Sequence, residues 1–160
     1  DGLTPFVTAC AETQAAAVKI VNAAVLRVLA AEGKARPVLS GWAALTDYLR
    51  ADMAHRPVER VRVLFLDAKN MLIRDEAMSN GTVSEAAIYV REVIRRAIDL
   101  HASALILVHN HPSGDPKPSR QDIAVTRDVV EAGKRLGIVV HDHVIVGGAE
   151  CSSMRAQGLM

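Results

Sequence analysis

The spacing of hydrophobic residues changes near residue 58, and this change divides the chain into two kinds of sequence. Before it, residues 11–32 carry Ala, Val, Ile and Leu at helical spacing, with Gly33 as the stop. A second helix is predicted over residues 42–53, and the segment between the two, GKARPVLSG, has the composition of a linker. The front of the chain is therefore predicted to be helical.

After residue 58, apolar runs typical of strands alternate with amphipathic stretches typical of helices. The runs VRVLFLD and MLIRDEAM are separated by turn-forming residues and predict a hairpin. The run SALILVHNH begins with an almost wholly apolar stretch, which favours a central strand. The predicted elements are strands at 61–67, 71–78, 103–111, 138–147 and 150–154, and helices at 85–100 and 119–136.

This order of elements predicts the fold class. Strands that alternate with helices behind a leading hairpin favour an α/β (α+β) fold, a mixed β-sheet flanked by helices, over a bundle or an all-β sandwich. We expect two regions: a helical N-terminal segment at 1–54 and the main domain at 55–160.

Composition excludes some partners. The chain is 50% hydrophobic but only 3% aromatic, so its core must be aliphatic. The net charge of +1 gives no electrostatic argument for nucleic acid or an anionic membrane. We recognise no signal peptide and no apolar run near the ~20 residues that span a bilayer. Cys10 and Cys151 are far apart in the sequence and suit a reducing compartment, which predicts a cytoplasmic protein.

The candidate chemistry lies where the apolar run ends. Side chains alternate along a strand, so His109 and His111 are predicted to project from the same face. Pro and Gly residues turn the following loop back, and Asp122 stands at the start of the next helix. Two imidazoles and a carboxylate are ligands that zinc takes, and three protein ligands leave a fourth position for water.

The same residues have a structural interpretation. The sequence SRQD at 119–122 matches a capping box, with Ser119 as N-cap and Asp122 at the third helical position. In that arrangement Asp122 bonds back to the backbone of Ser119 and coordinates nothing. The residues alone leave the metal site and the helix cap as alternatives.

These motifs resemble those of a known family. The pattern H-x-H-P at 109–112 followed by S-x-x-D at 119–122 resembles the JAMM/MPN+ signature of zinc metallopeptidases. More specifically, HNHPSGDPKPSRQD with LFLD, GTVS, REV and DHVIVG resembles the bacterial RadC family over about residues 58–158. The resemblance implies a JAMM- or cytidine-deaminase-like three-layer arrangement for residues 55–160. The contiguous His-Asn-His is not the HNH nuclease motif, which spreads those residues over a ββ-metal unit.

The resemblance also implies a catalytic zinc centre. His109, His111 and Asp122 would hold the zinc ion. RadC-like sequences have a glutamate eight positions before the Asp of the LFLD strand, which is Glu59 here, and it would act as the general base. Ser119 would donate a hydrogen bond to the tetrahedral oxyanion. The substrate implied is a peptide or isopeptide amide in a peptide or protein, so the predicted activity is zinc-dependent amide hydrolysis.

Some residues are open to more than one interpretation. Without the resemblance, Glu59 is a solvated carboxylate at a strand end, and Glu76 is the fallback candidate for the base. The sequence HDH at 141–143 is a second H-x-H inside an apolar strand, with both imidazoles predicted on one face. Polar groups there need partners, so we interpret HDH as a polar network that supports a zinc ligand. Val90 and Ala156 depart from the usual Pro and Glu of the family, outside the metal set.

Two further hypotheses compete with zinc-dependent amide hydrolysis. RadC-like proteins carry a DNA-repair label, so the chain could be DNA-associated with a structural or vestigial metal site. A basic helix face at Arg91, Arg95 and Arg96 is the local argument for it, while residues 1–54 lack the glycine pattern of a helix-hairpin-helix and are interpreted as a truncated or degenerate one. The third hypothesis makes Cys151 a nucleophile paired with a histidine at position 141 or 143.

Overall fold

A computed structural model describes residues 41–80 and 87–160 of the chain, so the helix predicted at 11–32 lies outside the described residues. Most of the elements predicted after residue 41 are present, with bounds that differ by one or two residues. The strands are β1 (Arg60–Leu66), β2 (Leu72–Asn80), β3 (Ala104–Asn110), β4 (Val139–Val146) and β5 (Cys151–Ser153), and the helices are α2 (Trp42–Met53), α3 (Val90–Asp99) and α4 (Arg120–Arg135).

One helix begins later than predicted. The sequence predicted a helix from residue 85, but residues 87–89 are not helical and α3 begins at Val90. Tyr89 has an extended backbone at the N-cap position, with φ −92° and ψ 102°. An amphipathic pattern continues past the residue where the backbone turns, which is why helix ends are poorly read from periodicity.

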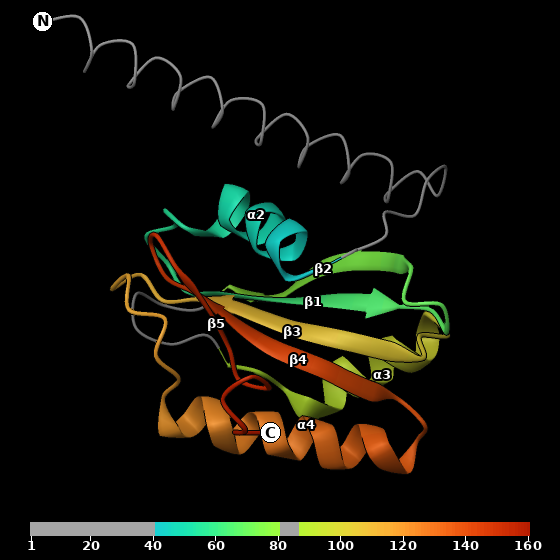
Figure 1. The fold of residues 1–160 in the computed structure, drawn as a ribbon. Helices are drawn as coiled ribbons and strands as arrows, with labels where there is room; N and C mark the ends of the chain where they lie inside the picture. Colours follow the sequence, from blue (N-terminus) through green and yellow to red (C-terminus); the bar gives the residue numbers. More distant parts are fainter. Residues whose placement is uncertain (1–40, 81–86) are drawn as a thin grey trace, which may run out of the picture.

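The five strands form one mixed sheet in the order β2-β1-β3-β4-β5. β1 is antiparallel to both β2 and β3, β3 is parallel to β4, and β5 returns antiparallel on β4. The predicted fold class is confirmed: the sheet is mixed, helices flank it, and the apolar run at β3 is its central strand (Figure 1).

The helices cover opposite faces of the sheet and make three layers (Figure 1). α2 packs on one face, where Leu45, Leu49 and Met53 join even-numbered residues of β1 and β3 in a buried cluster. α3 and α4 pack on the other face, where they cover odd-numbered residues of the same strands. The alternation of β1 and β3 therefore decides which layer each side chain enters.

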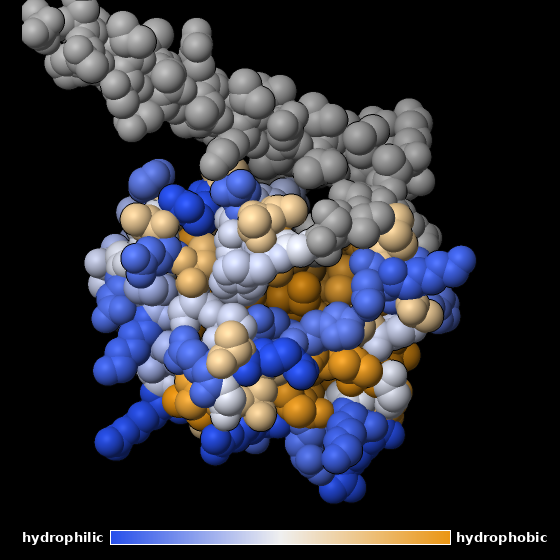
Figure 2. All heavy atoms as spheres, in the orientation of Figure 1, coloured by the Kyte–Doolittle hydropathy of each residue, from blue (hydrophilic) through white to orange (hydrophobic). Residues whose placement is uncertain are grey.

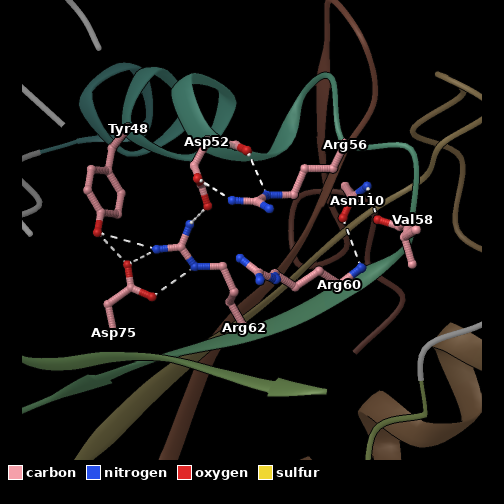
Figure 3. Close-up of polar contacts among 8 residues, drawn as sticks. All are labelled: Tyr48, Asp52, Arg56, Val58, Arg60, Arg62, Asp75 and Asn110. Atoms are coloured by element: carbon pink, nitrogen blue, oxygen red, sulfur yellow. Dashed lines mark hydrogen bonds and ion pairs between the residues drawn. The ribbon is translucent and has the colours of Figure 1, made fainter. Parts of the chain in front are cut away.

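A buried ion cluster fastens α2 to the sheet (Figure 3). Arg62 on β1 is only 4% exposed. Its Nε donates to Asp75 Oδ1 at 2.9 Å, and its Nη1 donates to Asp52 Oδ2 of α2 at 2.8 Å. Tyr48 of α2 donates its hydroxyl to Asp75. A buried charge is costly unless it is paired, so α2 is held at one place on the sheet by these partners as well as by apolar contact.

Hydrophilic and hydrophobic residues share the face of the molecule seen in Figure 2. In the view of Figure 2, hydrophilic residues cover much of this face and hydrophobic residues show between them. Across residues 41–80 and 87–160, no helix combines the length and apolar character needed to cross a bilayer.

Candidate metal centre

The three predicted metal ligands lie together. One ligand atom from each of His109, His111 and Asp122 can be chosen so that all lie within 4.8 Å of one another. His109 Nε2 is 2.9 Å from His111 Nε2 and 3.3 Å from Asp122 Oδ1, and His111 Nε2 is 3.6 Å from Asp122 Oδ2. A tetrahedral ion with bonds of ~2.0–2.2 Å separates its ligand atoms by about 3.3–3.6 Å. The donor set and the two imidazole–carboxylate distances therefore fit a zinc ion, and the two imidazole nitrogens lie closer together than zinc ligands do.

The sheet and one loop bring the ligands together. His109 is the next-to-last residue of β3, and His111 continues the parallel pairing when its N–H donates to the Val146 carbonyl at 3.0 Å. The chain then turns at Gly114, whose φ of +84° suits glycine, and reaches α4. A Cβ at Gly147, in the β4–β5 turn, would overlap the Gly114 carbonyl oxygen, so the two turns pack backbone to backbone.

Asp122 is both a helix cap and a candidate ligand. Its Oδ2 accepts the Ser119 N–H at 2.7 Å, and the Ser119 hydroxyl accepts the Asp122 N–H at 3.1 Å, which makes the capping box complete. The same carboxylate faces both imidazoles. The cap and the metal site, posed above as alternatives, are compatible because a carboxylate has two oxygens with several lone pairs. The cap holds the carboxylate in place beside the histidines.

Electrostatics make the site attractive to a cation. Burial acts to raise the pKa of Asp122, but the neighbouring imidazoles of His109 and His111 and the hydrogen bond with Ser119 together hold this pKa well below its usual value. The pKa of His111 is raised, chiefly by its hydrogen bond with Asp122. His111 Nδ1 donates to the Asp115 carbonyl at 2.8 Å, which leaves Nε2 directed at the site. A proton on this nitrogen and a metal ion would compete for one lone pair.

Glu59 precedes β1 and acts on the site through its charge. Val61 pairs with His109 across β1 and β3. Continuing this antiparallel register brings Glu59, which precedes β1, opposite His111. Glu59 is partly buried, and its charge contributes to the raised pKa of His111. The sequence-predicted base is therefore close enough to act on the site electrostatically.

Asn110, between the two histidines, fixes the backbone around Glu59 (Figure 3). Its Oδ1 accepts the Arg60 N–H at 3.0 Å, and its Nδ2 donates to the Val58 carbonyl at 3.2 Å. Asn110 is buried at 1% exposure and points to the opposite face from the histidines. The sequence offered no reason to select Asn110, because its partners are about 50 residues away.

Ser119 is exposed at the entrance to α4. Its hydroxyl oxygen accepts the Asp122 N–H, and a hydroxyl that accepts one bond still has a proton to donate. The predicted role as an oxyanion donor is compatible with this position and stays a prediction.

His143 contacts the site from the neighbouring strand. It is fully buried, with Nε2 2.8 Å from His109 Nδ1 and Nδ1 2.5 Å from the Thr126 hydroxyl. Burial, and next the charge of His109, hold the pKa of His143 well below its ordinary value. Thr126 was missed by the sequence reasoning. Its signal was present: it lies one helical turn after Asp122, on the same side of α4.

His141 and His143, predicted to project from one face of a strand, have different surroundings. The register of β4 on β3 skips from Val140 to Asp142, so His141 has no partner there. His141 Nε2 instead lies 2.7 Å from Asn70 Oδ1, in the β1–β2 turn. Asp142 accepts the N–H groups of His143 and Arg155 at 2.7 and 3.0 Å, which orders the C-terminal turn.

The remaining candidates lie outside the cluster. Glu76, the fallback base, lies on the edge strand β2 and accepts a hydrogen bond from Arg96 of α3. This hydrogen bond outweighs burial and lowers the pKa of Glu76. Cys151 on β5 has a thiol pKa raised by burial, which disfavours the thiolate. Both ring nitrogens of His143 face other partners, so the arrangement gives no support to a Cys–His nucleophile.

Comparison with known proteins shows the family of the chain. A RadC-like JAB domain matches residues 39–159. The UPF0758 protein of Rhodobacter capsulatus is 53% identical over 154 residues, which cover 96% of this chain and 72% of the relative. The UPF0758 protein of Ruegeria pomeroyi is 49% identical over 142 residues, which cover 89% of this chain and 63% of the relative.

The mixed sheet, its three helices and the His-His-Asp cluster together define an α+β domain of the JAB type. Within that class, the chain belongs to the RadC family.

Proposed function

We propose that this protein is a zinc-dependent hydrolase of the JAMM type that cleaves a peptide or isopeptide amide. The observation that carries the proposal is the convergence of His109 Nε2, His111 Nε2 and the Asp122 carboxylate, with Glu59 beside them. Three ligands of this chemistry leave one vertex of a tetrahedron open, which is typical of catalytic rather than structural zinc.

Each residue has a role that follows from its position. His109, His111 and Asp122 would hold the ion, which supplies Lewis acidity that lowers the pKa of water to about 7. Glu59 would accept the proton of the attacking water and return it to the leaving amine. Ser119 would donate its hydroxyl proton to the oxyanion of the tetrahedral intermediate, a contribution of ~10²–10³ in rate for one donor.

Metal analysis beside activity tests the proposal. The purified protein is expected to hold about one zinc per chain, and His109→Ala is expected to hold none, because the ion loses one of only three protein ligands. Glu59→Gln should keep the metal and lose hydrolysis of a quenched fluorescent peptide library. Glu150→Gln, on the turn before β5, is the matched control and should keep both. A wild-type protein without metal, or a Glu59→Gln variant with full hydrolysis, would contradict the proposal.

Two of the three arginines that favour the DNA-associated alternative are engaged by carboxylates. Arg95 is paired with Glu92 and Asp99 along α3, and Arg96 is paired with Glu76. Arginines neutralised by carboxylates offer little to phosphates. The two functions differ in salt dependence: DNA binding should weaken steeply with ionic strength, whereas amide hydrolysis should not. A cytoplasmic location stays part of the proposal and depends on the wide separation of the two cysteines in the sequence.

A further inference from the structure

We propose that Thr126 and His143 are positioning residues that fix the imidazole of His109 with its proton on Nδ1, so that the lone pair of Nε2 faces the metal position. The inference depends on the metal site proposed above. It assigns a role to two residues outside the ligand set. Each hydrogen bond that joins them to His109 has a defined donor and a defined acceptor.

The direction is set at Thr126 on α4. Its hydroxyl oxygen lies 2.5 Å from the backbone carbonyl of Asp122 and 2.5 Å from His143 Nδ1. A carbonyl oxygen can only accept, so the single hydroxyl proton of Thr126 goes to Asp122. A threonine in a helix commonly makes this bond to the carbonyl four residues before it. The oxygen of Thr126 is then an acceptor toward His143.

The remaining protons follow from that choice. His143 Nδ1 must carry a proton, because two lone pairs would otherwise face each other at 2.5 Å. Because the His143 ring is fully buried and its nitrogens face Thr126 and His109 rather than a carboxylate, the ring is neutral, and its other nitrogen, Nε2, is then an acceptor. Since His143 Nε2 lies 2.8 Å from His109 Nδ1, His109 donates from Nδ1. The Nε2 lone pair of His109 is thereby left facing His111 and Asp122.

Burial protects this series of hydrogen bonds from water. Thr126 and His143 are 0% exposed and His109 is 1% exposed, so solvent water does not compete for these bonds. This series of hydrogen bonds begins at the backbone carbonyl of Asp122 and ends at the imidazole of His109, which faces the carboxylate of the same Asp122. One turn of α4 thus supplies a ligand and sets the tautomer of another ligand.

The decisive experiment reads the tautomer directly in the metal-free protein. Long-range proton–nitrogen NMR correlations of the imidazole rings report which nitrogen carries the proton. In the chelator-treated wild type at a pH of about 8, His109 and His143 should both be protonated on Nδ1. A proton on His109 Nε2 would overturn the inference, and this readout needs neither a variant nor a bound metal.

Two substitutions at one position sharpen the test. Thr126→Val keeps the shape but removes the acceptor, so His143 should shift its proton to Nε2 and His109 should follow. Thr126→Ser keeps the hydroxyl and should restore the wild-type tautomers. Zinc affinity, measured by competition with a chromogenic chelator, should fall about 10-fold in Thr126→Val and return in Thr126→Ser, as is usual when a partner of a metal-bound histidine is lost.

A packing control separates this role from general loosening of α4. Val129 is fully buried on the same helix, and Val129→Ala should lower stability without changing the tautomers or the zinc affinity. If Val129→Ala weakens zinc as much as Thr126→Val does, the effect is loss of packing and the inference fails. If the wild type shows the expected tautomers but binds no zinc, the proposed function fails while the hydrogen-bond chain stands.

Discussion

The two faces of the sheet each bury a polar network, and the networks differ in what completes them. On the α2 face, Arg62 is surrounded by Asp75, Asp52 and Tyr48 (Figure 3), so a cation meets carboxylates within the protein. On the α4 face, His109 and His111 bring two nitrogen atoms to one carboxylate, and the nitrogens are 2.9 Å apart. Two imidazole lone pairs at that distance need a cation, either a proton or a metal ion, between them.

The comparison teaches how to distinguish a structural network from a functional one. The cluster at Arg62 contains its own charges and gains nothing from a ligand, so its purpose is to fix α2. The cluster at His109 is complete only when something outside the chain is added. Loss of the first should therefore be seen in folding, and loss of the second in metal binding.

The largest expected effect is on stability, from Arg62→Ala. The change leaves Asp75 buried without its cation, and breaking a buried pair from one side typically costs about 3–5 kcal/mol. Urea unfolding should show this loss in the free energy of unfolding. Zinc affinity of the fraction that stays folded should be unchanged, and a parallel loss of zinc binding would mean that the two networks are not independent.

The converse variant is Asp122→Asn. An amide oxygen can still accept the Ser119 N–H, so the helix cap should largely survive and its contribution to stability should change by less than about 1 kcal/mol. Zinc affinity should fall by about 100-fold or more. Loss of a residue that only supports a ligand typically costs about 10- to 100-fold. Calorimetric zinc titration measures the affinity. Ser119→Ala is the matched control, because it damages the cap from the other side and should leave most of the affinity.

The pH dependence should have opposite signs with and without metal. In the metal-free protein the lowered pKa of Asp122 stabilises the fold above its unfolded value near 3.8, and this contribution is lost as pH falls. The raised pKa of His111 stabilises below its unfolded value near 6.5, and this contribution is lost as pH rises through the raised pKa. The pair should therefore stabilise most between about pH 4 and 6.5.

Zinc needs the Nε2 lone pair of His111, so zinc affinity should instead rise with pH through the raised pKa. Urea unfolding in the presence of a chelator measures the pH dependence of metal-free stability. Competition for zinc over about pH 5–9 measures the pH dependence of zinc affinity. His111→Gln should flatten the upper limb of the metal-free profile. A metal-free protein that gains stability as pH rises above 7 would contradict the assignment.

The smallest effect is expected for Asn110→Ala. This residue connects the two faces, since its amide bonds the backbone on either side of Glu59 while its neighbours in sequence face the metal position. Hydrogen exchange at the Arg60 amide should become faster, and zinc affinity should stay within about 3-fold of wild type, since no ligand or partner of a ligand is changed. Asn110→Asp should keep the bond to the Arg60 N–H and serve as the partial control.

Much of the α4 face could be predicted from the sequence because its signals are local. His109 and His111 share a face through strand alternation, and SRQD predicts both the cap and the carboxylate at the start of α4. The relation between cap and ligand could not be decided locally, because it depends on where α4 sits against β3. The contact of His143 with His109 likewise depends on the register shift in β4.

The α2 face was largely invisible in the sequence. Arg62 and Asp75 are 13 residues apart, and Arg62 and Asp52 are 10 apart. Charged residues in such positions are ordinarily solvated, and their burial follows only from the docking of a helix on a hairpin. Pairing between distant elements is a property of the assembled sheet, and no periodicity encodes it.

The contact between Gly147 and the turn at Gly114 has a consequence for access to the centre. Gly148 donates its N–H to the Gly114 carbonyl at 3.3 Å, and a side chain at 147 would also press on Pro116, only 2.9 Å from an added Cβ. The rim of the site from 112 to 118 is therefore tied to the β4–β5 connection. Any movement of this rim must carry the connection with it, although the connection supplies none of the three candidate ligands.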